Sequence, residues 1–250
     1  MNQRLTEYFN DHIRIAIKAL NPTDSRRINF GVYKFPDGQL QVIFPKDTID
    51  EVSSNVFHVE ASCYTPDLMH ILDQLIFFFK KKGKTITVKI QYLYGARSDK
   101  RESEEFYTCE VAALTLKHFD NLNNVKYLAP HCALDSDESD FTLPKELDLS
   151  KYSCIVFPDE SARLRYKNSL SGYSLPFVTA SKKREQDTGK IVSYNVPKLS
   201  GDETRVLVID DLCDYGTTFR LVSEGLGDVK KDLFIHHGVF TENAPSRLLE

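Results

Sequence analysis

The chain has 250 residues, of which 41% are hydrophobic and 27% are charged, enough for one large domain or two small ones with a buried core. Its formal net charge of −4 argues against a broad nucleic-acid-binding surface, and its five cysteines, scattered without a CxxC pair, argue against a zinc site and favour a reducing compartment. We find neither a signal peptide nor an apolar run long enough to span a bilayer, so we expect a cytoplasmic protein without a membrane partner.

The first third of the chain predicts a helix, a hairpin and a second helix. Apolar residues at helical spacing predict the first helix over residues 5–20. Asp37-Gly38 is a turn signal, and the alternation that follows it predicts a strand up to residue 44. Residues 68–79 have the period of a second helix, and the basic run at residues 80–82 is typical of a helix C-terminus. A nucleic-acid contact is the weaker interpretation of this short run.

A charged loop follows the next predicted strand. Residues 85–93 alternate as a strand and lead into a loop that contains Arg97 and Asp99. An arginine at the end of a strand can neutralise a polyphosphate. A solvated charged loop is the alternative interpretation.

The following segment leads to a histidine and then to a run of acids. A helix is predicted over residues 105–119 and a short strand over residues 125–128, after which comes His131. A lone histidine after a strand is usually a loop residue. Four acidic residues lie between residues 135 and 140. Such acids can coordinate Mg²⁺, but a solvated acidic turn is the more common outcome of a charge run.

A second unit is expected to begin near Pro144. Residues 152–157 predict a buried strand that leads to Asp159, and residues 175–180 predict another short strand.

A basic loop over residues 181–189 contains Lys182 and Arg184 and precedes a strand predicted over residues 191–196. In phosphoryl transfer, a mobile basic loop can close over the bridging phosphate oxygens as charge builds on them, and it can exclude water. A basic hairpin tip is the alternative interpretation.

The most informative stretch covers residues 205–226. Residues 206–209 predict one buried strand, two acids (Asp210 and Asp211) follow it, and a Gly/Thr turn at residues 214–218 opens a helix. A helix N-terminus offers N–H groups and a positive dipole end to an anion, whereas paired carboxylates suit vicinal hydroxyls or a metal ion. A sugar phosphate satisfies both halves. The alternative is a plain strand-to-helix turn with an Asp as N-cap.

Six short motifs resemble, in the same order, those of ribose-phosphate diphosphokinases, also called PRPP synthetases (PRPP is phosphoribosyl diphosphate). They are Phe35–Gln39, Arg97–Asp99, His131, Asp159–Arg165, Lys182–Arg184 and Asp210–Thr218. Each motif is weak alone, but six in order are a strong signal. The last is also the signature of type I phosphoribosyltransferases. The resemblance implies an α/β fold of two phosphoribosyltransferase-like units, residues 1–143 and 144–250, each a mainly parallel sheet flanked by helices.

The resemblance also implies roles for individual residues. Those expected to bind ATP are Phe35, Asp37, Gln39, Arg97, Asp99 and His131. Those expected to be catalytic are Lys182, Arg184 and Arg97. Those expected to hold the ribose phosphate are Asp210, Asp211, Asp214, Tyr215, Gly216, Thr217 and Thr218. His131 and Asp159 are expected to contact Mg²⁺. Because the Phe35 segment serves the neighbouring subunit's site in the family, a homodimer or a higher homo-oligomer is implied.

The implied reaction moves the β,γ-diphosphate of ATP to the anomeric hydroxyl of ribose 5-phosphate, which gives PRPP and AMP. Two departures from the family bear on the acceptor: Tyr215 stands in place of a small Thr, and Thr217 in place of a Gly. The bulkier loop suggests a substituted phosphate, as in ADP-ribose. Some phage-encoded relatives make ADP-ribose pyrophosphate for rebuilding NAD, and such a protein would work in the host cytoplasm.

Two other classes of protein stay open. A phosphoribosyltransferase would consume PRPP and need no ATP, but members of that class have no segment like Phe35–Gln39. A catalytically silent, regulatory relative would bind nucleotides. Such relatives tend to lose the loop cations, which this chain keeps at Lys182 and Arg184.

Overall fold

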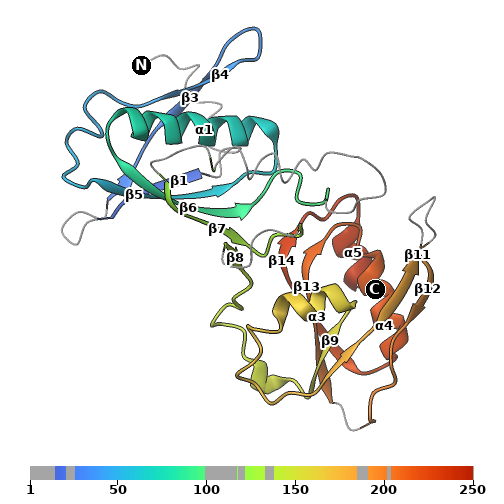
Figure 1. The fold of residues 1–250 in the computed structure, drawn as a ribbon. Helices are drawn as coiled ribbons and strands as arrows, with labels where there is room; N and C mark the ends of the chain where they lie inside the picture. Colours follow the sequence, from blue (N-terminus) through green and yellow to red (C-terminus); the bar gives the residue numbers. More distant parts are fainter. Residues whose placement is uncertain are drawn as a thin grey trace. The chain divides into compact units, whose positions relative to one another are not determined.

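The computed structural model of the protein describes residues 15–20, 26–98, 117, 122–132, 138–184, 191–201 and 204–249. The chain divides into two compact units, unit 1 (Met1–Asp140) and unit 2 (Phe141–Glu250) (Figure 1). The boundary expected from the sequence lies slightly later, after residue 143.

Unit 1 is built on a six-stranded sheet in the order β2-β1-β5-β6-β7-β8. Strands β5 to β8 run parallel, whereas β1 is antiparallel to both of its neighbours. The strands are β1 (Ile15–Ala19), β2 (Arg27–Ile28), β5 (Val56–Ser62), β6 (Thr85–Tyr92), β7 (Leu122–Leu128) and β8 (Ser139–Asp140). This confirms the strands predicted over residues 85–93 and 125–128. The helix predicted over residues 105–119 lies outside the described residues except for Lys117, which is helical.

Strand β1 shows that the helix predicted over residues 5–20 is wrong at its C-terminal end. Ile15, Ile17 and Ala19 are buried and the residues between them are more exposed, which is a period of two. Pairing with β2 and β5 buries this face, and tertiary pairing of this kind outweighs helical spacing in a short apolar run. Residues 5–14 lie outside the described part of the chain.

Helix α1 (Pro66–Lys81) packs on the sheet of unit 1, and both of its ends have clear signals (Figure 1). The Thr65 side chain caps the N-terminus by accepting a hydrogen bond from the backbone of the first turn, and Pro66 follows it. Basic residues fill the last turn, and Gly83 adopts a φ of 65° just beyond it. The helix predicted over residues 68–79 is therefore confirmed, and it extends two residues further at each end.

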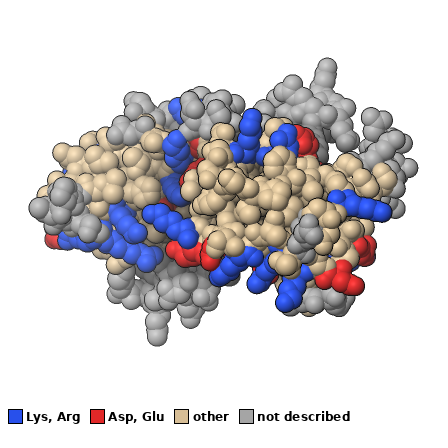
Figure 2. Space-filling view, turned by 90° about the horizontal axis from the view of Figure 1, so that it is seen from below, with Lys and Arg blue, Asp and Glu red and all other residues tan. Residues whose placement is uncertain are grey.

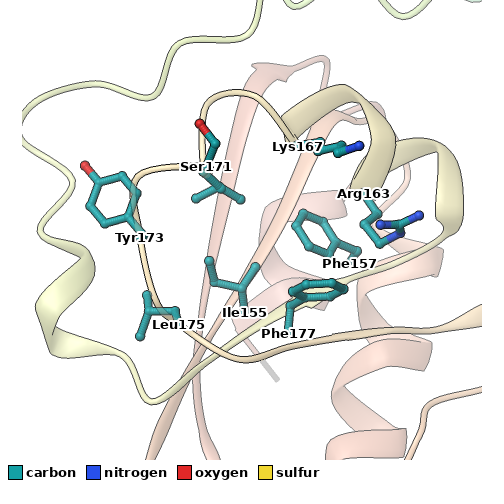
Figure 3. A pocket seen from close by; sticks show the side chains of 9 residues that line it. Ile155, Phe157, Arg163, Lys167, Ser171, Tyr173, Leu175 and Phe177 are labelled. Atoms are coloured by element: carbon teal, nitrogen blue, oxygen red, sulfur yellow. The ribbon is translucent and has the colours of Figure 1, made fainter.

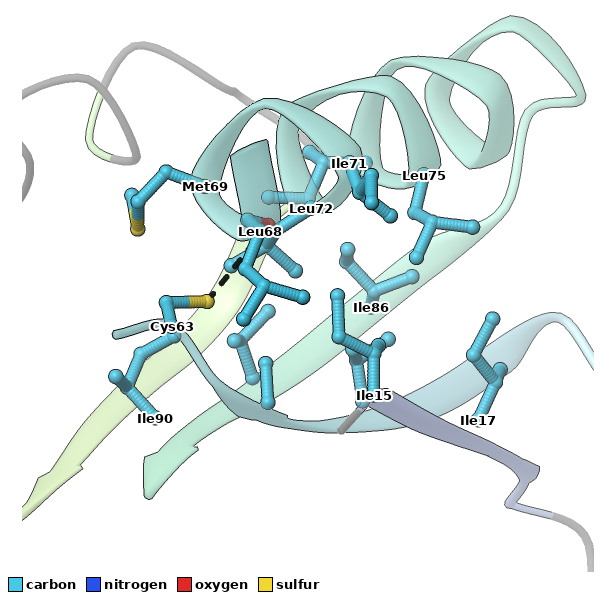
Figure 4. Close-up of a cluster of buried hydrophobic side chains, with 14 of the residues drawn as sticks. Ile15, Ile17, Cys63, Leu68, Met69, Ile71, Leu72, Leu75, Ile86 and Ile90 are labelled. Atoms are coloured by element: carbon cyan, nitrogen blue, oxygen red, sulfur yellow. Dashed lines mark hydrogen bonds between the residues drawn. The ribbon is translucent and has the colours of Figure 1, made fainter. Parts of the chain in front are cut away.

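The core of unit 1 lies between α1 and the sheet (Figure 4). Leu72 and Leu75 of the helix belong to one buried cluster with Ile17 and Ile86 of the strands. Cys63 is also buried there, and burial raises the pKa of its thiol to about 12. The thiol is therefore a packing group rather than a nucleophile.

A separate two-stranded hairpin, β3 (Gly31–Lys34) and β4 (Leu40–Ile43), confirms the strand predicted after Asp37-Gly38. Gly38 has a φ of 94°, a conformation that other residues rarely adopt. Gln74 of α1 anchors the hairpin, because its side chain accepts from the Val42 N–H and donates to the Leu40 carbonyl, both at 2.9 Å.

Unit 2 is built on a four-stranded parallel sheet in the order β10-β9-β13-β14. The strands are β9 (Cys154–Phe157), β10 (Phe177–Thr179), β13 (Arg205–Cys213) and β14 (Lys230–Gly238). An antiparallel ribbon, β11 (Ser181–Arg184) and β12 (Ile191–Asn195), follows β10. The helices are η2 (Leu149–Lys151), α3 (Glu160–Tyr166), α4 (Thr217–Leu226) and α5 (Ala244–Leu249). The strands predicted in this half are confirmed, with ends shifted by up to four residues.

Both faces of this sheet are covered, and for that reason β9 and residues 206–209 of β13 are apolar at every position. Ile155 and Leu207 lie in a cluster with residues of α3, whereas Val156 and Val208 lie in a cluster with residues of α4. Successive side chains of a strand point to opposite faces, so α3 and α4 cover opposite faces.

The surface carries both signs of charge. On the face drawn in Figure 2, Lys and Arg side chains lie in small groups, and Asp or Glu side chains lie beside several of them. Among the described residues, none of the helices has the length and apolar character needed to cross a membrane.

Candidate active site

The predicted site residues of unit 2 lie at one edge of its sheet. Asp159 follows β9, the Lys182–Arg184 segment follows β10, and Asp210 and Asp211 lie near the end of β13. Because these strands are parallel, their carboxyl ends share an edge, which is where open α/β sheets bind ligands.

Helix α3 connects three of these residues. Asp159 is its N-cap and accepts a hydrogen bond from the Ala162 N–H at 2.9 Å. At the other end of the helix, Arg165 donates to the Asp211 carboxylate at 2.8 Å. The next residue, Tyr166, donates its hydroxyl proton to the backbone carbonyl of Asp210 at 3.0 Å. One short helix therefore holds both acids of β13.

The two acids have different environments because adjacent strand residues face opposite sides of the sheet. Asp211 is 0% exposed and lies on the α3 side with Arg165. Asp210 is partly exposed, and its carboxylate accepts a hydrogen bond from the Asp211 N–H at 2.9 Å. Burial, followed by the negative charge of Asp211, raises the pKa of Asp210 well above its usual value. Asp210 is thus the acid of this pair that a ligand can reach.

The raised pKa of Asp210 predicts that Asp210→Asn stabilises the free protein. The folded chain holds the proton more tightly than the unfolded chain does, so ionisation of Asp210 costs stability at every pH above the unfolded value of about 3.9. At about pH 7 the variant should melt about 2–4 °C higher, the shift expected for ~1 kcal/mol. The gain should shrink towards about pH 4, where both states are protonated. Thermal melts at the two pH values measure it, and an equal gain at both would contradict it.

The turn after β13 leaves the N-terminus of α4 without a side-chain cap among the described residues. Gly216 occupies the N-cap position with a φ of 78°. The alternative interpretation, an Asp as N-cap, is therefore wrong for this helix, and Asp214 instead accepts a hydrogen bond from Thr241. Backbone N–H groups in the first turn, at Thr217 and Thr218, are the kind of donors that bind a phosphate.

The ribbon that carries Lys182 and Arg184 is connected to the same site. The backbone of Lys182 pairs with that of Tyr194 on β12. Tyr194 donates its hydroxyl proton to the Pro158 carbonyl at 2.9 Å, next to Asp159. Burial, with the negative charges of Asp159 and Asp210, raises the pKa of Tyr194. The first residues of the predicted loop thus form strand β11, while residues 185–190 lie outside the described part.

Sequence reasoning missed three aromatic residues of this site: Tyr166, Tyr194 and His236. Tyr166 directly follows Arg165 of a recognised motif, and His236 directly precedes the HG dipeptide that ends β14. Their position next to motif residues is the sequence signal that could have identified Tyr166 and His236 as site residues. Cys213 is buried, and burial raises the pKa of its thiol to about 11, so it is a packing residue rather than a nucleophile.

Three predicted ATP-binding residues lie at the tip of the β3–β4 hairpin in unit 1. The Phe35 N–H donates to the Gln39 carbonyl at 2.8 Å, and the Gln39 N–H donates to the Asp37 carboxylate at 3.1 Å. All three side chains are exposed, and the ring of Phe35 contacts that of Tyr33 edge to face. The backbone of the tip is therefore held by hydrogen bonds, and its three side chains are accessible to a ligand or to a partner.

The remaining predicted residues of unit 1 lie at one edge of its sheet. Arg97 is exposed in the turn after β6, and His131 follows β7. Because β6 and β7 are adjacent and parallel, both residues lie at the carboxyl edge. Asp99 lies outside the described residues.

Of the two residues predicted to contact Mg²⁺, Asp159 has the chemistry that this ion prefers and His131 does not. Mg²⁺ takes oxygen ligands and needs only one or two carboxylates beside waters and phosphates, so the carboxylate of Asp159 fits. His131 offers nitrogen, which suits Mg²⁺ less well, and its role stays a prediction. Across the described ranges, no group of three or more His, Cys, Asp and Glu side chains gathers as a metal cage.

The acidic run at residues 135–140 is described only from Glu138 onwards. There, Glu138 lies 3.3 Å from the Lys117 ammonium and Asp140 lies 3.4 Å from the Lys89 ammonium. These two acids therefore have cationic neighbours from the protein itself.

Unit 2 also has a hollow of about 240 Å³ away from these residues (Figure 3). Its walls are largely apolar, including Ile155, Leu175 and Phe177, with Arg163 and Lys167 of the α3 side at one end. None of the predicted site residues lines it. The candidate site is thus defined by its donors and acids rather than by this hollow.

The comparisons with known proteins extend over both units. No protein-family model matches the chain. A ribose-phosphate pyrophosphokinase of Sulfolobus acidocaldarius is 25% identical over 243 residues, which cover 90% of this chain and 81% of that protein. A protein of the same name from Sulfurisphaera tokodaii is 23% identical over 239 residues, covering 86% and 78%. The crystal structure of phosphoribosylpyrophosphate synthetase from Mycobacterium smegmatis has a similar fold, with a TM-score of 0.65 and 20% identity over 90% of this chain and 78% of that one.

Proposed function

Because the chain belongs to the ribose-phosphate pyrophosphokinase family, we propose that it transfers the β,γ-diphosphate of ATP to the anomeric hydroxyl of ribose 5-phosphate and releases AMP. One observation carries the proposal beyond the family. A partly exposed carboxylate, Asp210, and the uncapped N-terminus of α4 lie on the same strand–turn–helix, where one sugar phosphate can engage both.

In the acceptor half of this site, the carboxylate of Asp210 accepts hydrogen bonds from the ribose hydroxyls, and Asp211 supports it from the core. The loop from Asp214 to Thr218 surrounds the 5-phosphate, with donors from the first turn of α4. The acids exclude the phosphate by repulsion and the helix end attracts it, so the sugar has one orientation.

In the transfer step, the anomeric oxygen attacks the β-phosphorus, the bond from that phosphorus to the α-phosphate oxygen breaks, and AMP leaves. This chemistry needs positioning and charge neutralisation more than covalent help. Lys182, Arg184 and Arg97 supply positive charge to the transferred group, and Phe35, Asp37 and Gln39 hold adenine. Asp159 would help to hold Mg²⁺ together with the nucleotide, and the ion would supply further positive charge. Exclusion of water by the basic segment protects ATP from hydrolysis.

The direct test measures AMP formed from ATP and Mg²⁺ with ribose 5-phosphate as acceptor. We expect AMP and PRPP in equal amounts, no AMP without acceptor, and loss of the reaction when Mg²⁺ is chelated. AMP formation independent of any sugar, or consumption of PRPP without ATP, would contradict the proposal and favour a nucleotide hydrolase or a phosphoribosyltransferase.

ADP-ribose is a second candidate acceptor, and Tyr215 is the observation that favours it. Tyr215 is 45% exposed within the phosphate loop, where its ring could stack on the adenine of a larger acceptor. A matched comparison of the two acceptors, by AMP release at equal concentrations, separates them. If ADP-ribose is the acceptor, Tyr215→Ala should raise its KM by about 5- to 10-fold, which is the worth of one stacking contact, and leave that of ribose 5-phosphate unchanged.

We further propose that the protein acts in the cytoplasm as a homodimer or a larger homo-oligomer. The oligomer is supported by the tip of the β3–β4 hairpin. Gln74 anchors the base of this hairpin, and Phe35 and Asp37 at its tip are exposed, so they are accessible to a second subunit. Size measurement in solution tests the oligomer.

A further inference from the structure

Tyr166 and His236 form a hydrogen-bonded pair beneath the acids of β13. The hydroxyl oxygen of Tyr166 lies 2.6 Å from Nδ1 of His236 and 3.0 Å from the backbone carbonyl oxygen of Asp210. The two rings stack, with centroids 5.7 Å apart and planes within 16°. On its other side, Nε2 of His236 lies 3.2 Å from the Thr142 carbonyl oxygen. Three contacts therefore run in one chain from Thr142 to Asp210.

The protonation state of His236 decides how many of these three contacts can be hydrogen bonds. Burial, and then the negative charges of Asp211 and Asp210, raise the pKa of Tyr166, so its hydroxyl keeps its proton. That single proton can go either to the Asp210 carbonyl or to Nδ1. Carbonyl oxygens only accept, so all three contacts are hydrogen bonds only when both ring nitrogens of His236 carry protons. A neutral imidazole loses one of the three.

The hydrogen bond that depends on His236 is the one from the Tyr166 hydroxyl to the Asp210 carbonyl. It holds the peptide group between Asp210 and Asp211. The carbonyl of that peptide accepts from Tyr166, and its N–H donates to the Asp210 carboxylate at 2.9 Å. A tilt of this peptide therefore rotates the carboxylate of Asp210. Asp211 is held separately by Arg165, so the change falls on the accessible acid.

We propose that Tyr166 and His236 are positioning residues that make the orientation of Asp210, and with it the affinity for the vicinal hydroxyls of the sugar acceptor, depend on the protonation of His236. This inference rests on the proposed function for the role of Asp210. The titratable neighbours of His236 from the elements packed against it are Tyr166 on α3, Asp211 on β13 and His237 on its own strand. The β13–β14 register places Asp211 level with His236, and the ring centroid of His237 is 6.2 Å away. Nearby, the Arg165–Asp211 pair adds one charge of each sign.

The kinetic test compares the KM for ribose 5-phosphate at about pH 6 and about pH 8, the range in which histidines titrate. For the wild type, we expect the KM to rise with pH by about 3- to 10-fold more than in the variants, the worth of one hydrogen bond. In Tyr166→Phe the chain is broken at every pH, so the KM is raised and this extra rise is absent. In His236→Asn an amide N–H replaces Nδ1–H at every pH, so the KM stays low and the extra rise is again absent.

Changes in kcat and in the KM for ATP should stay within about twofold, because the pair acts on the acceptor alone. Tyr152→Phe is the matched control, since it removes a tyrosine hydroxyl that is hydrogen-bonded to Asp232, near Arg205 at the opposite end of β13. It should keep the wild-type pH profile. Equal profiles in the wild type and Tyr166→Phe would overturn the inference.

A second measurement needs no substrate and separates this inference from the proposed function. Nitrogen NMR of histidine-labelled protein should show both nitrogens of His236 protonated at about pH 6, with Tyr166→Phe shifting this titration. A neutral His236 there, or a titration unchanged in Tyr166→Phe, would refute the coupling. If the NMR result holds but no sugar supports AMP release, the proposed function fails instead.

Discussion

Arg165→Ala should destabilise the protein by about 3–5 kcal/mol, which is the usual cost of removing one partner of a buried ion pair. Asp211 is 0% exposed, and Arg165 donates to its carboxylate at 2.8 Å, so the variant leaves a buried carboxylate without its cation. Either Asp211 takes up a proton or α3 moves away, and both cost stability. Urea unfolding followed by circular dichroism measures the loss.

Arg163→Ala is the matched control for this prediction, because Arg163 lies on the same helix and pairs with the exposed Glu160. It should leave the unfolding midpoint nearly unchanged. The double variant Arg165→Ala/Asp211→Asn should recover at least half of the loss, since no charge is then left buried. If the two arginine variants behave alike, Asp211 has another source of compensation and the ion pair is not what holds it.

Lys182→Ala should lower kcat by about 10²- to 10³-fold while the affinity for ATP stays within about tenfold. A cation that neutralises charge built up during transfer acts mainly in the transition state, so its loss appears in turnover rather than in nucleotide binding. The backbone of Lys182 pairs with Tyr194, whose hydroxyl contacts the residue before Asp159, so the variant changes a segment that is joined to the site.

Lys183→Ala is the neighbouring control, because the family resemblance selects Lys182 and Arg184 and leaves Lys183 without a role. We expect a less than threefold change in kcat for Lys183→Ala, because no role in charge neutralisation is assigned to this residue. Binding of ATP by titration calorimetry and turnover by AMP release are both needed. Unchanged turnover in Lys182→Ala would remove Lys182 from the catalytic machinery.

The helix ends and the strands of the interior were predictable because local signals agree with the fold. Thr65-Pro66 and Gly83 delimit α1 by capping chemistry, and the run at residues 206–209 is apolar at every position because both faces of β13 are covered. The failure at β1 has the opposite cause. Ile15, Ile17 and Ala19 fit a period of two, but other apolar residues nearby fit 3.6, and only pairing with β2 and β5 selects between them.

Motif order, strand–turn–helix chemistry and the adjacency of two acids can all be inferred from residues 205–226 alone, because they depend on neighbours in the chain. Adjacency even implies that Asp210 and Asp211 face opposite sides of a sheet. Which of the two stays accessible depends on the position of α3, whose Arg165 comes from 46 residues away and neutralises Asp211 in the core. The pairing of Tyr166 with His236, 70 residues apart, likewise exists only after β14 has docked beside β13. Contacts of this kind follow from packing, so no local pattern encodes them.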